Sequence, residues 1–284
     1  MHDLISLFED YSLETTARDA PAVNTLPLGL PRPAQVFVPW LPDEHDDARI
    51  AACRAVRAQG LEPVPHLSAR RIASVDQLDR LLGALRAQAQ VSSLFLIAGD
   101  LAQPSGPFEH SLAVIETGLL ERHGFTHVGI AGHPDDHPDV AEPILWDAML
   151  AKIAALRARG LDTQVVTQFS FDAARVLGWL QEVRERGVDV PVRIGIPGPA
   201  GIKTLLGFAR RCGVSASGSA LAKYGLSLSR LIGSAGPDRF LGELIAGLNA
   251  MEAGTVRLHV FPFGGFYKFG DWMAKATSAA PINA

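Results

Sequence analysis

The chain has 284 residues, 48% of them hydrophobic and 20% charged, so it can bury a full core and is not a disordered chain. Its formal net charge of −4 disfavours a nucleic-acid partner, which would need a basic surface. The two cysteines, Cys53 and Cys212, form no CxxC pair, so neither a zinc site nor a disulfide framework is predicted.

Localisation follows from the same features. No apolar stretch reaches about 18 residues, which predicts no membrane span. The first residues lack the basic region and apolar core of a signal peptide. With only two separate cysteines, the chain fits a reducing compartment, and we expect a cytoplasmic protein.

Short apolar, β-branched runs alternate along the chain with longer segments of helical period. The eight predicted strands are residues 11–15, 35–40, 62–67, 93–100, 127–133, 163–169, 191–197 and 256–263. Several are continuously apolar, such as Leu94-Phe95-Leu96-Ile97 in the fourth. That pattern is typical of strands buried on both faces of a parallel sheet.

The segments between the strands have the marks of helices. Helices are predicted at residues 46–59, 75–87, 111–122, 143–159, 173–186, 202–212 and 237–251. In the second of them, Leu78, Leu81 and Leu85 recur at helical spacing, and Ser74 can cap the first turn. Glycines such as Gly60 stand just after predicted helix ends, where a left-handed cap favours them.

Eight strands with crossover helices predict one α/β domain, a single (β/α)8 TIM barrel over residues 1–284. An open doubly wound sheet is the competing architecture. Residues 17–33 are expected to form a long first loop, and the stretch from 198 to 255 to hold two or three helices. Residues 274–284 are expected to be a flexible tail.

Polar side chains stand at the predicted carboxyl ends of several strands, where barrels of this kind carry their chemistry. They are Glu14, His66, Asp100, His133, Gln168 and His259, with His137 just beyond the fifth strand. Singly, a strand-end histidine is more often structural, and an aspartate after glycine is more often a turn residue. Together they predict a pocket for a planar ligand with polar edges. No metal site is predicted, because no suitable cysteine or histidine pattern occurs.

Short motifs match one enzyme family in order along most of the chain. Thr167-Gln168-Phe169-Ser170-Phe171-Asp172 resembles a Thr-Gln-Phe-x-Phe-Asp signature, and residues 131–138 resemble Ala-x-Tyr-Pro-Glu-x-His-Pro. Weaker matches are Ser12-Leu13-Glu14-Thr15, Pro65-His66-Leu67, Ala98-Gly99-Asp100 and His259-Val260-Phe261. The family that these motifs resemble is the methylenetetrahydrofolate reductases.

The resemblance implies a flavoenzyme barrel with FAD at the carboxyl rim. It would transfer a hydride between 5,10-methylenetetrahydrofolate and 5-methyltetrahydrofolate, with NAD(P)H as reductant. Glu14 would be the general acid that protonates N10 of the folate, a role suited to a carboxyl of raised pKa. Asp100 would stabilise the cation formed on the pterin, and Gln168 would bind the pterin edge.

The resemblance also implies the groups that hold the ligands. Those for FAD are His66, Gly99, Asp100, His133 and His137, with Lys152 at the phosphates. Phe208 would stack on the folate or on the adenine of the nicotinamide cofactor, and Phe261 and Phe263 would wall the substrate.

Three residues depart from the family pattern. Ala98 replaces an arginine and removes one expected FAD phosphate contact, His133 replaces a tyrosine, and Thr204 stands near an expected substrate-binding glutamine. One alternative is therefore a demethylation enzyme that mainly oxidises methyltetrahydrofolate. Others are a flavin- or folate-binding barrel without turnover and a flavin-free lyase or aldolase. The choice between NADH and NADPH and the possibility of a homo-oligomer stay open.

Overall fold

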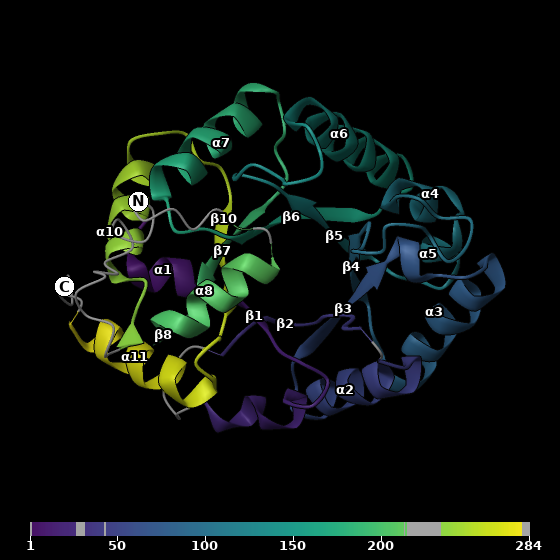
Figure 1. The fold of residues 1–284 in the computed structure, drawn as a ribbon, viewed down its shortest axis with the longest axis horizontal. Coiled ribbons are helices and arrows are strands. Elements are labelled where there is room, and N and C mark those ends of the chain that lie inside the picture. Colours follow the sequence, from purple (N-terminus) through teal and green to yellow (C-terminus); the bar gives the residue numbers. More distant parts are fainter. Residues whose placement is uncertain (1, 27–31, 43, 213, 215–233, 280–284) are drawn as a thin grey trace.

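The structure, a computed structural model, describes residues 2–26, 32–42, 44–212, 214 and 234–279. In this part of the chain, eight parallel strands close into a barrel in the order β1-β10-β7-β6-β5-β4-β3-β2 (Figure 1). They are β1 (Ser12–Glu14), β2 (Gln35–Val38), β3 (Glu62–Ser68), β4 (Ser93–Ile97), β5 (His127–Gly132), β6 (Asp162–Phe169), β7 (Val192–Pro197) and β10 (Val256–Phe261). The predicted single (β/α)8 barrel is confirmed, and the open sheet is wrong.

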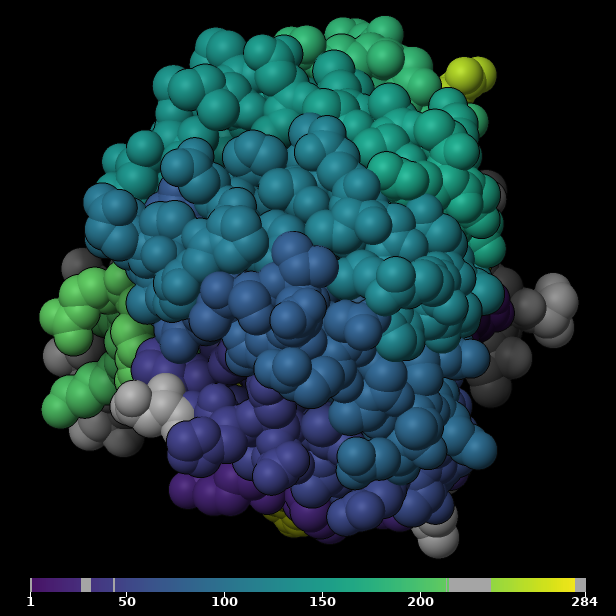
Figure 2. Space-filling view, turned by 90° about the vertical axis from the view of Figure 1, so that its right-hand side faces the viewer, coloured from purple at the N-terminus to yellow at the C-terminus, as the bar shows by residue number. Residues whose placement is uncertain are grey.

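Helices surround the barrel, and every predicted helical segment contains one (Figure 1). They are α1 (Leu4–Phe8), α2 (Asp46–Ala58), α3 (Val75–Ala89), α4 (Ser111–Glu116), α5 (Leu119–Arg122), α6 (Glu142–Ala158), α7 (Ala173–Glu185), α8 (Ile202–Arg211), α10 (Asp238–Asn249) and α11 (Phe266–Ala279). Figure 2 shows the closed outer surface on the side of α3 to α6. None of the helices in the described residues is both long and apolar enough to cross a membrane.

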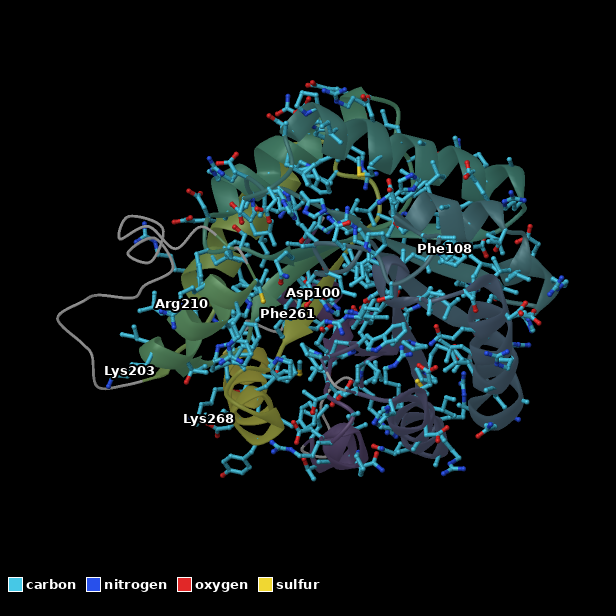
Figure 3. All side chains as sticks on the ribbon, turned by 45° about the vertical axis from the view of Figure 1, so that its right-hand side comes forward. Asp100, Phe108, Lys203, Arg210, Phe261 and Lys268 are labelled. Carbon is cyan, nitrogen blue, oxygen red and sulfur yellow. The ribbon has the colours of Figure 1, made fainter. Side chains whose placement is uncertain are left out.

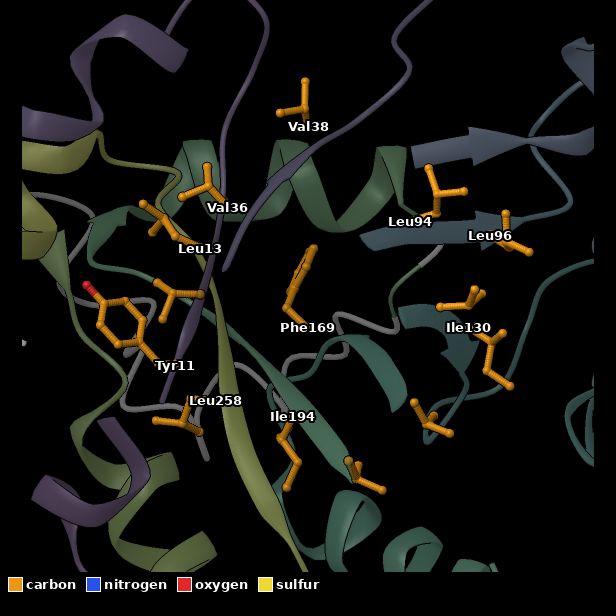
Figure 4. Close-up of a cluster of buried hydrophobic side chains, with 14 of the residues drawn as sticks. Tyr11, Leu13, Val36, Val38, Leu94, Leu96, Ile130, Phe169, Ile194 and Leu258 are labelled. Atoms are coloured by element: carbon orange, nitrogen blue, oxygen red, sulfur yellow. The ribbon is translucent and has the colours of Figure 1, made fainter. Parts of the chain in front are cut away.

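Buried side chains form two layers, one on each side of the barrel wall. Alternate residues of a strand, such as Leu94 and Leu96, pack outward in a large cluster under the helices (Figure 4). Phe95 lies between them and belongs to a small separate cluster with Phe37. Because successive side chains of a strand point to opposite faces, continuous apolar strands fill both layers.

The structure corrects the predicted elements in three places. The segment 111–122 is two helices, since Gly118 has φ +71° and breaks the helical path. The predicted first loop contains a 3-10 helix, η1 (Ala20–Thr25). Residues 274–279 of the expected tail are helical in α11, where Met273 is buried against the core. Residues 280–284 of that tail lie outside the described residues.

The long stretch between the last two barrel strands contains α8 and α10, which agrees with the predicted two or three helices. A short antiparallel pair, β8 (Ala200–Gly201) and β9 (Ser234–Ala235), joins the start of α8 to the residues just before α10. Residues 215–233 of this stretch lie outside the described residues.

Candidate functional site

Glu14 ends β1 inside the barrel mouth, where two histidines flank its carboxylate. Its Oε2 atom lies 3.1 Å from Nε2 of His259 and 3.6 Å from Nε2 of His66. The parallel register that pairs Ser12 with His259 brings β10 beside β1, and His66 reaches the same carboxylate from β3. The side chain of Glu14 is 18% exposed and that of His259 only 1%. These residues form a nearly buried acid–imidazole cluster at the carboxyl end of the barrel.

The histidines decide the charge of Glu14. Burial acts to raise the pKa of its carboxyl, but the charge of His66 and the hydrogen bond to His259 outweigh it and lower the pKa to about 2. Burial lowers the pKa of His259, and Glu14 opposes that effect. Glu14 is therefore a carboxylate near neutral pH in the free protein. The raised pKa expected from the family role is not found.

Asp100 lies on the rim just beyond β4, after a glycine in a left-handed conformation. Gly99 has φ +95°, which turns the chain so that the aspartate side chain stays exposed on the rim (Figure 3). Arg71 donates from Nη2 to both carboxylate oxygens, at 2.7 and 3.0 Å, and from Nε at 3.1 Å. Arg71 comes from the turn η2 (Ala69–Arg71) that follows β3. Arg71 was not among the predicted site residues, although two adjacent arginines follow the third predicted strand.

The loop from β5 to α6 carries His133 and His137, and Lys152 of α6 lies in the same region. The rings of His133 and His137 are 5.4 Å apart. Burial lowers the pKa of His133 to about 4, with smaller contributions from His137 and Lys152. Burial also lowers the pKa of Lys152 to about 8, and no acidic partner of its ammonium occurs among the described residues. This region therefore offers a neutral His133 imidazole, the adjacent ring of His137 and a half-buried cation that has no counter-ion among the described residues.

A pocket of about 440 Å³ opens beside this loop, between α6 and α7. Trp146 and Trp179 line it, with ring centroids 6.1 Å apart, and Arg175 on its edge pairs with Asp136 at 3.0 Å. A second hollow of about 30 Å³ lies on the other side of the same loop and reaches Gln168. The loop thus separates an outer groove from the barrel mouth.

Phe208, expected to stack on a ligand, lies together with Phe261 and Phe263, which are expected to wall the substrate. Phe208 of α8 stacks on Phe263, with centroids 4.0 Å apart and planes 14° apart. Phe261 lies between this pair and the acid–imidazole cluster, since its ring is 5.6 Å from Phe263 and 4.7 Å from His259. Phe169, which was predicted as a strand and motif residue but not as a site residue, packs edge-on against Phe263 at 4.9 Å. The aromatic wall is continuous with the cluster around Glu14.

Gln168 lies at an irregularity of the barrel wall. The register between β6 and β7 shifts between Val166 and Phe169. The side-chain oxygen of Gln168 accepts a hydrogen bond from the Phe169 amide at 3.1 Å. Its side-chain nitrogen donates to no residue that the structure describes, so this nitrogen is available to a ligand.

We expect Gly195→Ala to damage this part of the wall. A Cβ at Gly195 would lie 2.6 Å from backbone atoms of Gln168 and Thr167, so the strand must shift and the free energy of unfolding should fall by about 1–3 kcal/mol. Chemical denaturation measures the loss. Gly178→Ala in α7 is the control, since nothing lies within 4 Å of the added atom. Equal stability of both variants would contradict the predicted clash.

No group of three or more histidine, cysteine or acidic side chains that could hold a metal ion occurs among the described residues. For a flavin dinucleotide, the donors present do fit. The uncompensated ammonium of Lys152 suits a phosphate, and the half-buried glycine turn at Gly99 has no side chain to keep its backbone from a planar ring. Arg71 is engaged by Asp100, and Ala98 offers no charge, so Lys152 is the cation of this set that is free to pair with a phosphate.

Comparison with known proteins points to the same family as the motifs. Methylenetetrahydrofolate reductase (NADH) 1 of Arabidopsis thaliana is 24% identical over 166 residues. The chain is methylenetetrahydrofolate reductase-like. The match covers 54% of this chain and 27% of the plant enzyme, so the matched part spans about a quarter of the length of that relative.

A solved structure shows the same fold over nearly the whole chain. A protein from Clostridium thermocellum that binds two copies of 5-methyl-5,6,7,8-tetrahydrofolic acid superposes with a TM-score of 0.62 and 12% identity, covering 94% of each chain. No protein-family model matches the chain. The relation to the methylenetetrahydrofolate reductases therefore rests on the plant relative, the motifs and the shared barrel.

Proposed function

We propose that the protein is an FAD-dependent oxidoreductase that interconverts 5,10-methylenetetrahydrofolate and 5-methyltetrahydrofolate, with NAD(P)H as the reductant. The observation that carries the proposal is the position of Glu14. It lies in the barrel mouth between two imidazoles, and an aromatic wall that includes the stacked pair Phe208 and Phe263 continues from it. The similarity to the plant reductase and the folate-binding barrel of the same fold supports a folate ligand.

The folate would lie between Gln168 and the aromatic wall. The side-chain amide of Gln168 has a free donor for the pterin edge, and the stacked pair Phe208 and Phe263 provides apolar faces. Glu14 would then face N10, the amine that must gain a proton as its bond to the one-carbon unit breaks. The remaining cation on N5 would be stabilised by the carboxylate of Asp100, which Arg71 holds in one orientation.

The cofactor would extend from the mouth toward the β5–α6 loop. Lys152 would pair with its phosphates, His133 would contact it as a neutral imidazole, and His137 would contact it beside His133. His66, Gly99 and Asp100 would bound the flavin end. When bound, FAD supplies the hydride acceptor and donor that no side chain can provide. The same site serves both directions, so methyltetrahydrofolate oxidation during demethylation uses the same residues.

A binding protein without turnover is the second candidate, and Ala98 favours it. The loss of a cation beside Asp100 leaves one less group for a cofactor phosphate, while Gln168 and the aromatic wall expected to bind the folate are present. A flavin-free lyase or aldolase would use the same barrel mouth without the Lys152 region.

The absorbance spectrum of the purified full chain separates these candidates. We expect visible flavin bands, after incubation with FAD if the protein loses it during purification, and bleaching of those bands when 5-methyltetrahydrofolate is added without oxygen. Bound flavin that stays oxidised would favour a binding protein. A chain that takes up no FAD at all would contradict the proposed flavoenzyme.

A further inference from the structure

A hydrogen-bonded chain extends from Glu14 into the barrel wall. Nε2 of His259 lies 3.1 Å from Glu14 Oε2, and Nδ1 of the same ring lies 2.8 Å from Ser12 Oγ. Ser12 is fully buried and His259 is 1% exposed. Both residues come from neighbouring strands in register, so the barrel wall fixes the chain. The residues therefore form a fixed relay that ends at the carboxylate facing the substrate.

Ser12 can satisfy His259 in either protonation state. With a neutral ring, the Ser12 hydroxyl donates to Nδ1 and Nε2–H donates to Glu14. With a protonated ring, Nδ1–H donates to Ser12 Oγ, and the hydroxyl turns to the Leu258 carbonyl at 3.4 Å. A hydroxyl that both donates and accepts removes the cost of an unpaired buried group when the ring gains or loses a proton.

The groups around Glu14 and His259 have opposite effects on the pKa of His259. Burial, His66 and Arg193 lower the pKa of His259, whereas the Glu14 carboxylate raises it. Cys212 and His66 are the other titratable groups that interact electrostatically with the Glu14 carboxylate. Phe37 packs on both imidazoles, at 4.6 Å from His259 and 6.0 Å from His66, and adds no charge. A proton on these groups belongs to the pair rather than to either residue.

We propose that Ser12, His259 and Glu14 form one proton-transfer unit, in which a protonated His259 supplies the proton that Glu14 delivers to the folate. Because burial lowers the pKa of His259, this protonated state fills as the pH falls below neutral. This inference rests on the proposed function and explains how a carboxylate can act as an acid. The proton moves from His259 Nε2 to Glu14 Oε2, and from there to N10. As the bond between N10 and the one-carbon unit breaks, its electron pair stays on N10, the positive charge remains at N5, and His259 becomes neutral.

His66 completes the unit without joining the relay. Its Nε2 atom is buried and has no hydrogen-bond partner among the described residues, and it faces Glu14 across 3.6 Å. Its backbone carbonyl accepts from the buried Arg49 at 3.0 Å, which fixes the strand end. The unpartnered nitrogen points to a group that arrives with the ligand, beside the oxygen that releases the proton.

A titration of the histidine side chains by nuclear magnetic resonance tests the coupling without cofactor or turnover. We expect Glu14→Gln to lower the pKa of His259 by about 1–3 pH units, because the neighbouring negative charge is lost. The His259→Gln spectrum assigns the signal, and exposed Glu252→Gln is the control. An unchanged pKa of His259 in Glu14→Gln would overturn the proposal.

The kinetic test uses Ser12→Ala, which removes one hydroxyl and leaves both titrating groups. We expect the folate half-reaction to slow about five- to tenfold at neutral pH and its pH optimum to move to lower pH, with unchanged affinity for 5-methyltetrahydrofolate. His259→Gln should slow the step by about 10²-fold. It should also remove the part of the pH profile in which the rate follows the protonation of His259. A pH profile unchanged in both variants would show that His259 has only a structural role. Loss of turnover in the wild type would instead contradict the proposed function, and the titration result would still stand.

Discussion

Replacing Glu14 with glutamine is expected to slow the folate half-reaction by about 10²- to 10⁴-fold. Glutamine has nearly the same shape and can keep the hydrogen bond to His259, but it cannot pass a proton to the folate amine. Lys152, the residue assigned to the cofactor phosphates, lies on α6 and is untouched. The flavin spectrum and the affinity for FAD should therefore stay as in the wild type. Rapid mixing of the reduced protein with 5,10-methylenetetrahydrofolate, in the absence of oxygen, measures the rate.

Glu252→Gln is the matched control, because this exposed side chain takes the same substitution far from the barrel mouth. It should react at the wild-type rate. A Glu14→Gln protein that reduces the folate normally would exclude Glu14 as the last proton donor. A protein that has lost its flavin as well would place Glu14 in cofactor binding instead.

The barrel could be predicted because its signals are local. Continuous apolar runs such as Leu94-Phe95-Leu96-Ile97 need only a few neighbouring residues to be recognised as buried parallel strands. The same reasoning placed Glu14 and His66 at strand ends, and closure of the barrel brings them to one carboxylate. The position of a side chain along its strand thus predicted the rim on which it lies.

The contacts within the site could not be predicted in the same way. Ser12 and His259 are 247 positions apart, and only the register between the first and last strands makes them neighbours. Arg71 reaches Asp100 through a short turn whose geometry no periodicity describes. The low pKa of Glu14 has the same origin, since it depends on two imidazoles brought from other strands. Long-range contacts, rather than residue type, set the charge of the site.

Truncation of Phe169 to alanine is expected to affect both the stability of the fold and the affinity for folate. Phe169 is fully buried at the end of β6, where it packs on Phe261 at 5.4 Å and Phe263 at 4.9 Å. Loss of a buried phenylalanine lowers the free energy of unfolding by about 3–5 kcal/mol. Because the removed ring supports the aromatic wall, Phe261 and Phe263 gain freedom, and ordering them again on binding weakens the affinity for 5-methyltetrahydrofolate.

Phe125→Ala separates the two effects. Phe125 is equally buried but precedes β5 at the opposite end of the barrel, so its truncation removes a ring of the same size without touching the mouth. Both variants should lose about 3–5 kcal/mol in chemical denaturation, and only Phe169→Ala should bind 5-methyltetrahydrofolate more weakly in calorimetry. If the two variants bind the folate equally well, the aromatic wall is not its binding surface, and the substrate must enter the barrel mouth elsewhere.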